Sequence, residues 1–152
     1  FSTPISDYPT QGLNALGQQA TAVDARLIMQ YFANSGWFGM LQGGITSRSN
    51  PTPTSAPVAA KIGKAAENYY FDIYYDFQNT EGGADYLDGT NPAFTSLGVS
   101  YHKLGGTFYK PFSSGKMGLA FGAYAVLAGR NVGQSFGGSA AFIYKMKYLK
   151  NE

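Results

Sequence analysis

The segment Tyr69–Gln78 (YYFDIYYDFQ) constrains the fold more than any other part of the chain. Its odd-numbered positions are all apolar or aromatic, whereas its even-numbered positions carry Tyr, Asp and Gln. A period of two residues predicts a β-strand with one apolar face and one polar face. The apolar face of such a strand must be covered, either by other protein or by lipid.

Similar alternation recurs along the chain and predicts seven strands and no convincing helix. The second of them, at 37–48, is the weaker because it contains several glycines. The fifth loses its alternation near Lys103–Gly106, which predicts a β-bulge there. The predicted strands are 23–32, 37–48, 57–65, 69–78, 94–109, 117–128 and 136–148.

The connections predict an up-and-down arrangement. As far as the fifth strand, long and short connections alternate, so the long ones would gather at one end of an antiparallel meander. Residues 1–21 are expected to form a long loop at that end. Bacterial single-chain barrels have even strand numbers. We therefore expect 1–152 to be a single β-barrel domain that is incomplete at its N-terminus, with Phe1 at the outer end of an earlier strand. A strand hidden in 1–21, or closure by several chains, are the alternatives.

Composition favours a membrane setting. Charged residues make up 13% of the chain, against roughly 25% in an ordinary soluble domain. The sequence has no Cys, no run of about 18 apolar residues, and no basic cluster of the kind that binds nucleic acid. The expected fold is an all-β, antiparallel up-and-down transmembrane β-barrel, or the C-terminal seven or so strands of one. A soluble β-sandwich or a β-rich filament subunit is the alternative.

The barrel interpretation assigns side chains to the two faces. Lysine in place of Phe71 should block membrane assembly, whereas lysine in place of Asp72 should be tolerated. The candidates for lining the lumen are Asp24, Arg26, Gln30, Lys61, Asp72 and Asp76. The candidates for facing lipid are Leu27, Met29, Phe71, Ile73, Tyr75, Phe142 and Tyr144.

Little in the sequence indicates catalysis. His102 is the single histidine and no GxSxG motif accompanies it, so we expect a lumen or interface residue. Asp72 and Asp76 would lie about 13 Å apart on one strand, too far to share a proton. Asp85 and Asp88 are weak calcium-ligand candidates, because their loop lacks EF-hand spacing. We expect no cofactor, no metal and no enzymatic activity.

Several stretches resemble the C-terminal hairpins of Gram-negative outer-membrane barrels of the transporter-like or porin-like type. They are GWFGMLQGGITSRSNPTP, YYFDIYYDFQNTEGGADY, FTSLGVSYHKLGGTFYKP and LAGRNVGQSFGGSAAFIYKM. Gly129-Arg130-Asn131, at a loop entrance, is the closest to a signature. Such barrels usually end on an aromatic residue; Tyr148 fits, although Leu149–Glu152 follow it.

This resemblance implies a bacterial outer-membrane location and a barrel longer than this chain. The expected function is a passive channel or transporter for small solutes, or a membrane anchor of an envelope complex. The alternative is a secreted β-rich structural subunit of a surface layer or filament. The expected partners are the lipid bilayer and either other envelope proteins or copies of the chain itself, without nucleic acid.

Overall fold

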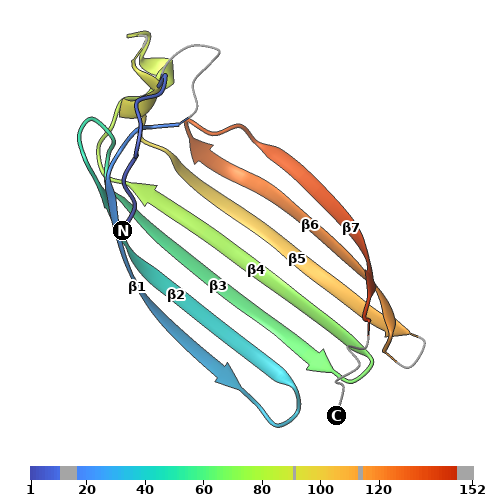
Figure 1. The fold of residues 1–152 in the computed structure, drawn as a ribbon. Helices are drawn as coiled ribbons and strands as arrows, with labels where there is room; N and C mark the ends of the chain where they lie inside the picture. Colours follow the sequence, from blue (N-terminus) through green and yellow to red (C-terminus); the bar gives the residue numbers. More distant parts are fainter. Residues whose placement is uncertain (11–16, 91, 113–114, 147–152) are drawn as a thin grey trace.

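The computed structural model describes residues 1–10, 17–90, 92–112 and 115–146. They form one seven-stranded antiparallel sheet in which the spatial order of the strands follows the chain (Figure 1). The all-β, up-and-down antiparallel architecture predicted from the sequence is therefore confirmed. The strands are β1 (Ala22–Phe32), β2 (Trp37–Arg48), β3 (Ser55–Ala66), β4 (Tyr69–Thr80), β5 (Ser100–Phe112), β6 (Met117–Arg130) and β7 (Ser135–Tyr144).

The predicted start of the fifth strand is wrong by six residues. β5 begins at Ser100, and Phe94–Ser96 form a short 3-10 helix, η2. Both the amide and the hydroxyl of Ser96 donate to the carbonyl of Ala93, at 3.0 and 2.8 Å. These local hydrogen bonds hold the backbone in a turn and compete with strand pairing.

The predicted bulge exists, but the extra residue lies on the neighbouring strand. The register between β5 and β6 shifts between His102 and Lys103, which pair with Ala128 and Val126. Leu127 of β6 is therefore the additional residue, and β5 alternates regularly along its length. The seventh strand ends at Tyr144, earlier than predicted; residues 147 and 148 of that prediction lie outside the described residues.

The two ends of the sheet differ, as the connection lengths predict. Segments 1–10, 17–21, 49–54, 81–90, 92–99 and 131–134 lie at one end, which we call the loop end. The connections 33–36 and 67–68 and residues 115–116 lie at the other, the turn end (Figure 1). The 81–99 connection contains η1 (Tyr86–Asp88) and η2, and it is closed by hydrogen bonds between Ala84 and both Ser96 and Gly98.

The sheet has no hydrophobic core. No hydrophobic side chain of the described residues is buried, and many large ones are more than half exposed. The cross-strand register sorts the strand residues onto two faces, which we call the polar face and the apolar face. All the buried strand residues lie on the polar face, which is thus the more enclosed one; they are Thr46, Ser55, Asp72 and Thr80 together with Gly63 and Gly118.

The sheet is not closed on itself. β1 pairs with β2 and β7 pairs with β6, and no described strand links β1 to β7. An open up-and-down antiparallel sheet of this kind is consistent with part of a barrel.

Candidate functional site

The polar face holds all six residues that the sequence analysis assigned to a lumen. Asp24, Arg26 and Gln30 lie on β1, and the other three lie on β3 and β4. The register places all six on one side of the sheet: Asp24 is opposite Thr46, Lys61 is opposite Tyr74 and Asp76 is opposite Lys103. Whether this side encloses water stays a prediction.

Among the described residues, three ion pairs lie on this face, which also carries Arg48; that arginine donates to the Pro53 carbonyl and the Ser55 hydroxyl instead of a carboxylate. Arg26 donates two hydrogen bonds to Asp24, at 2.6 and 2.9 Å, and the Thr46 hydroxyl donates a third at 2.7 Å. Lys103 lies 2.9 Å from Asp76. The sequence analysis did not include Lys103 in this set. Only the β4–β5 register shows that Lys103 lies opposite Asp76.

Asp72 is the most enclosed charged residue of the face. It is 4% exposed, and its Oδ2 accepts a hydrogen bond from the Tyr70 hydroxyl and lies 3.5 Å from Lys61 Nζ. Its Oδ1 has no partner among the described residues. The expected tolerance of lysine in place of Asp72 stays a prediction, and these contacts with Lys61 and Tyr70 argue for a cost in stability.

Tyrosine rings connect the charged pairs. The ring of Tyr74 lies between two ammonium groups, with Lys61 Nζ 5.8 Å and Lys103 Nζ 5.5 Å from its centroid. Lys103 is also 5.6 Å from the centre of the Tyr124 ring. Cation–π contacts of this kind are modest in energy, but they fix where the two lysines can extend.

The same rings lie against glycines of the next strand. A Cβ on Gly105 would come 2.4 Å from the Tyr74 ring, and one on Gly137 would come 2.5 Å from the Tyr124 ring. Glycine lets an aromatic side chain of the neighbouring strand lie flat on the sheet. The ring-on-glycine contacts therefore join β4 to β5 and β6 to β7 on the polar face.

We expect Gly105→Ala to destabilise the sheet by about 1–2 kcal/mol, because the new methyl group meets Tyr74 and lies 2.8 Å from the Ala123 carbonyl. Denaturant unfolding of the folded protein measures this loss. Gly138→Ala is the matched control, since its Cβ would meet nothing closer than 3.5 Å. Equal losses for the two variants would contradict the proposed ring-on-glycine contact.

At the loop end, Arg130 and Asn131 hold the long 81–99 connection in place. The Arg130 guanidinium donates to the Gly82 and Gly83 carbonyls at 3.0 and 2.6 Å, and it contacts Asp85 at 3.4 Å. Asn131, which has a positive φ of 54°, donates to Ala84 and Gly98 and accepts from the Tyr86 amide. The loop-entrance residues that carried the family resemblance are thus the anchor of this connection.

The same contacts account for Asp85. Its Oδ1 accepts from the Leu87 amide at the start of η1, and its Oδ2 faces Arg130. In the described residues no group of three or more His, Cys, Asp or Glu side chains is placed to bind a metal ion. Of the two weak calcium-ligand candidates, Asp85 already has a cationic partner in Arg130.

We expect Arg130→Ala to loosen the 81–99 connection while leaving the strands folded. Loss of a charge-assisted hydrogen bond costs about 1.5 kcal/mol or more, which corresponds to roughly tenfold faster local opening. Limited proteolysis, with cleavage sites mapped by mass spectrometry, measures this rate. Arg26→Ala removes a cation that does not touch the connection and serves as control; equally fast cleavage in that variant would contradict the assignment.

The apolar face carries all seven residues assigned to lipid. They are Leu27 and Met29 of β1, Phe71, Ile73 and Tyr75 of β4, and Phe142 and Tyr144 of β7. Among the described strands this face has no acidic side chain. Its lysines, Lys64 and Lys110, each lie two residues from the turn end of their strands, and Arg130 is the last residue of β6.

Aromatic rings gather at the turn end of the apolar face. Trp37 and Phe71 meet edge to face with ring centroids 5.7 Å apart, and Tyr69 stacks on Phe71 at 6.2 Å. The Lys64 ammonium group lies 5.7 Å from the Trp37 ring. Rings with a polar edge beside a cation are typical of the boundary between lipid tails and headgroups.

His102 lies on the apolar face, close to the loop end, and so does not line the polar face. Its Nδ1 is 2.5 Å from the Tyr75 hydroxyl, and its ring centroid is 4.8 Å from that of Phe77. The register fixes only its face; that this face meets a membrane interface stays a prediction. It has no carboxylate or serine partner among the described residues.

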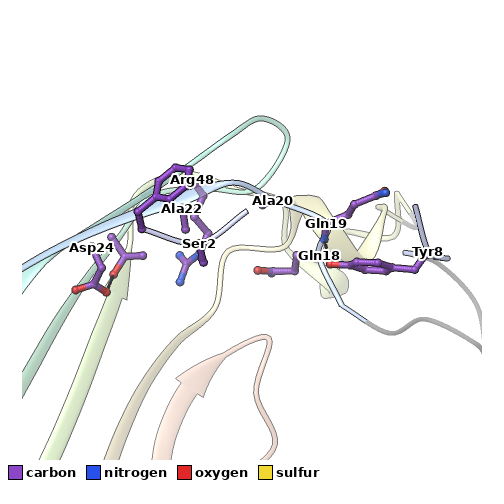
Figure 2. A pocket seen from close by; sticks show the side chains of 10 residues that line it. Ser2, Tyr8, Gln18, Gln19, Ala20, Ala22, Asp24 and Arg48 are labelled. Carbon is purple, nitrogen blue, oxygen red and sulfur yellow. Dashed lines mark hydrogen bonds between the residues drawn. The ribbon is translucent and has the colours of Figure 1, made fainter. Parts of the chain in front are cut away.

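A groove of about 480 Å³ opens where the N-terminal segment crosses the loop end of β1 and β2 (Figure 2). Ser2, Ala22, Asp24 and Arg48 line one part of it. In the other part, the Tyr8 hydroxyl accepts a hydrogen bond from the Gln19 amide at 2.9 Å. The lining residues do not form a hydrogen-bonded pair of nucleophile and base. The groove lies where Ser2, in the N-terminal segment, pairs with Ala22 of β1.

Comparisons with known proteins returned no match to any family model, any curated protein or any solved structure. In the described part of the chain, no helix has the length and apolar character needed to span a membrane.

Proposed function

We propose that this sheet is part of the wall of an outer-membrane β-barrel in a Gram-negative bacterium. The apolar face carries the proposal. Leu27 is 69% exposed, Ile62 58% and Phe142 61%, and comparable side chains cover every strand of that face. A water-soluble monomer rarely exposes so large a continuous apolar surface, whereas a barrel in lipid requires one.

The dimensions of the face support the same proposal. From Val23 to Tyr31 on β1, the apolar side chains extend about 26 Å along the strand, using a rise of ~3.3 Å per residue. Strands of 10–14 residues, as here, can cross a bilayer at the tilt found in barrels. Lys64 and Lys110 near the turn end would then reach the headgroups.

The polar face supports a passive, non-enzymatic role. Three acidic and three basic side chains form pairs along it: Asp24 with Arg26, Asp72 with Lys61, and Asp76 with Lys103. A lumen lined by these pairs, tyrosines and glycines, with Arg48 as a further cation at the loop end, would have at most a weak preference for anions. The best-supported function is therefore the passive passage of small polar solutes through the barrel. A barrel that anchors an envelope complex in the membrane is the second candidate.

One observation favours a different class of function. Both β1 and β7 have an edge that no other described strand of the sheet covers, and open edges can template pairing between molecules. A secreted β-rich subunit of a surface layer or filament would use them in this way, and would bury the apolar face against neighbouring subunits.

The mobility of the membrane-extracted protein in mild SDS, boiled against unboiled, tests the proposal. A closed barrel resists SDS until it is heated, so we expect the unboiled band to shift on boiling. Extraction from the soluble or sheared extracellular fraction, with no shift, would contradict the barrel and favour the secreted subunit.

A further inference from the structure

A cavity of about 210 Å³ lies at the loop end of the sheet. Arg48, Gln78 and Thr80 line it from the polar face of β2 and β4, and Thr52 lines it from the 49–54 connection. All of its lining residues are buried or half-buried, whereas several residues of the groove in Figure 2 are exposed. An enclosed site strengthens electrostatic contacts with whatever binds in it, because less water screens them. The remaining lining residues are Gln18, Pro53, Leu97 and Val99.

Arg48 is the cationic group of this cavity, and one edge of its guanidinium is not used within the described structure. Both of its hydrogen bonds come from Nη1, to the Pro53 carbonyl at 3.4 Å and to the Ser55 hydroxyl at 2.9 Å. None of the ion pairs among the described residues includes Arg48. The Nη1 contacts hold the side chain in place and leave Nε and Nη2 to donate elsewhere. Two neighbouring guanidinium nitrogens match the two oxygens of a carboxylate.

Thr52 supplies a second, independent sign of a ligand in the same cavity. The residue is 3% exposed, and its hydroxyl has no hydrogen-bond partner among the residues that the structure describes. A buried hydroxyl without a partner is unfavourable, and such groups are uncommon in folded proteins. An acceptor oxygen held by Arg48 would supply the missing partner, because a hydroxyl hydrogen can turn toward an acceptor.

The rest of the wall is fixed and partly apolar. The Gln78 amide nitrogen and the Thr80 hydroxyl both donate to the Val99 carbonyl, at 2.9 and 2.5 Å. These hydrogen bonds hold the chain at Val99 against β4. Pro53, Leu97 and Val99 then place apolar groups beside the arginine. A ligand that carries carbon next to its charge fits such a wall better than a fully hydrated inorganic anion does.

The approach to the cavity does not repel an anion. Gln18 and Arg48 line both the cavity and the groove of Figure 2, so a solute in the groove reaches Arg48. Asp24 also lines the groove, but its carboxylate forms an ion pair with Arg26. The uncompensated charge at this place is therefore the positive charge of Arg48.

We propose that this cavity binds the carboxylate group of a small organic acid, with Arg48 as the main recognition residue. The inference rests on the proposed passage of small polar solutes and names their chemical class. The bound acid has few carbon atoms, because the cavity is smaller than the about 300–1,000 Å³ of sites for drug-sized ligands. The Arg48 guanidinium donates to the two carboxylate oxygens, and the Thr52 hydroxyl donates to one of them.

Titration of the folded, membrane-extracted protein with propionate tests the site. Saturation-transfer NMR on the propionate protons measures the dissociation constant. We expect saturable binding of propionate and none of propionamide, which has nearly the same shape and no charge. Arg48→Gln should weaken propionate binding at least about tenfold, because charge-assisted hydrogen bonds are lost. Arg26→Gln removes a cation from the same face and is the matched control; we expect it to weaken binding less than about threefold, since charges outside the cavity are screened.

Thr52→Val is a second variant, and it keeps the inference testable if Arg48→Gln does not fold. Valine has nearly the shape of threonine but no hydroxyl. We expect propionate binding to weaken roughly threefold or more, because one hydrogen bond to the carboxylate is lost. Urea unfolding without propionate should show no loss of stability, because this hydroxyl has no partner among the described residues.

Three results would overturn the inference. The first is equal weakening by Arg48→Gln and Arg26→Gln, and the second is equal binding of propionate and propionamide. The third is tighter binding of inorganic phosphate than of propionate, which would remove the assignment to an organic acid. The heat shift of the same sample separates this failure from failure of the barrel: a retained shift without propionate binding removes only the site, whereas an absent shift means that the barrel itself has failed.

Discussion

Leu27→Lys is expected to prevent stable membrane insertion, whereas Ile28→Lys is expected to be tolerated. The two residues are neighbours near the middle of β1, and both are exposed, at 69% and 53%. Leu27 lies on the apolar face and Ile28 on the polar face. A cation facing lipid at the bilayer midplane costs about 2–4 kcal/mol, but a cation facing an aqueous lumen keeps its hydration.

The measurement is the fraction of protein that is membrane-inserted and heat-modifiable, compared with the unaltered chain. Ile73→Lys provides a second test on β4, in the centre of the sheet, where Ile73 is 53% exposed on the apolar face. If Leu27→Lys and Ile28→Lys are equally harmless, the apolar face does not contact lipid. If both are equally harmful, β1 is covered on both faces, as in a packed assembly.

Lys61→Met is expected to lower the free energy of unfolding by about 2 kcal/mol, somewhat below the usual cost of removing one partner of a fully buried ion pair. The reason is the difference in exposure between the partners. The Asp72 side chain is 3% exposed and the Lys61 side chain 32%. Without the lysine, the Tyr70 hydroxyl is the one partner left to the Asp72 carboxylate among the described residues.

Lys103→Met is the matched control, because Lys103 contacts the same Tyr74 ring from the other side. Its partner Asp76 is 29% exposed, so the loss should be at most about 1 kcal/mol. Unfolding by urea in lipid vesicles measures both. Asp72→Asn added to Lys61→Met should recover part of the loss. A larger effect for Lys103→Met, or no recovery in the double variant, would mean that Asp72 does not depend on Lys61.

The sequence predicted strand bounds well on the cleanly alternating β4, which differs only by two residues at its C-terminal end. β2 also has the predicted bounds, although its glycines weaken the alternation. The pattern failed at Phe94, where an apolar residue belongs to η2, because a local turn through Ser96 competed with strand pairing. The pattern also placed the bulge within β5, whereas the extra residue is Leu127 of β6. The position of a bulge can be assigned to one strand only when the pairing of both strands is known.

The candidate residues show the same division. Alternation sorted Asp72 and Phe71 onto opposite faces correctly, because neighbouring side chains of a strand must point to opposite sides. Alternation could not show that the Asp72 side chain is buried while the Asp76 side chain is 29% exposed. Nor could it show that Lys103 is the ion-pair partner of Asp76. Those facts depend on which residues of β3 and β5 lie opposite β4.

The sequence by itself determined the strands, their up-and-down order and the two faces, because these follow from local side-chain period and connection length. The tertiary structure decided the partners. The ion pairs Lys61–Asp72 and Lys103–Asp76, the rings over Gly105 and Gly137, and the Arg130–Asn131 anchor all join residues that lie on different strands or in distant loops. A shift of one residue in register would move every side chain of a strand to the other face, so only the paired sheet fixes them.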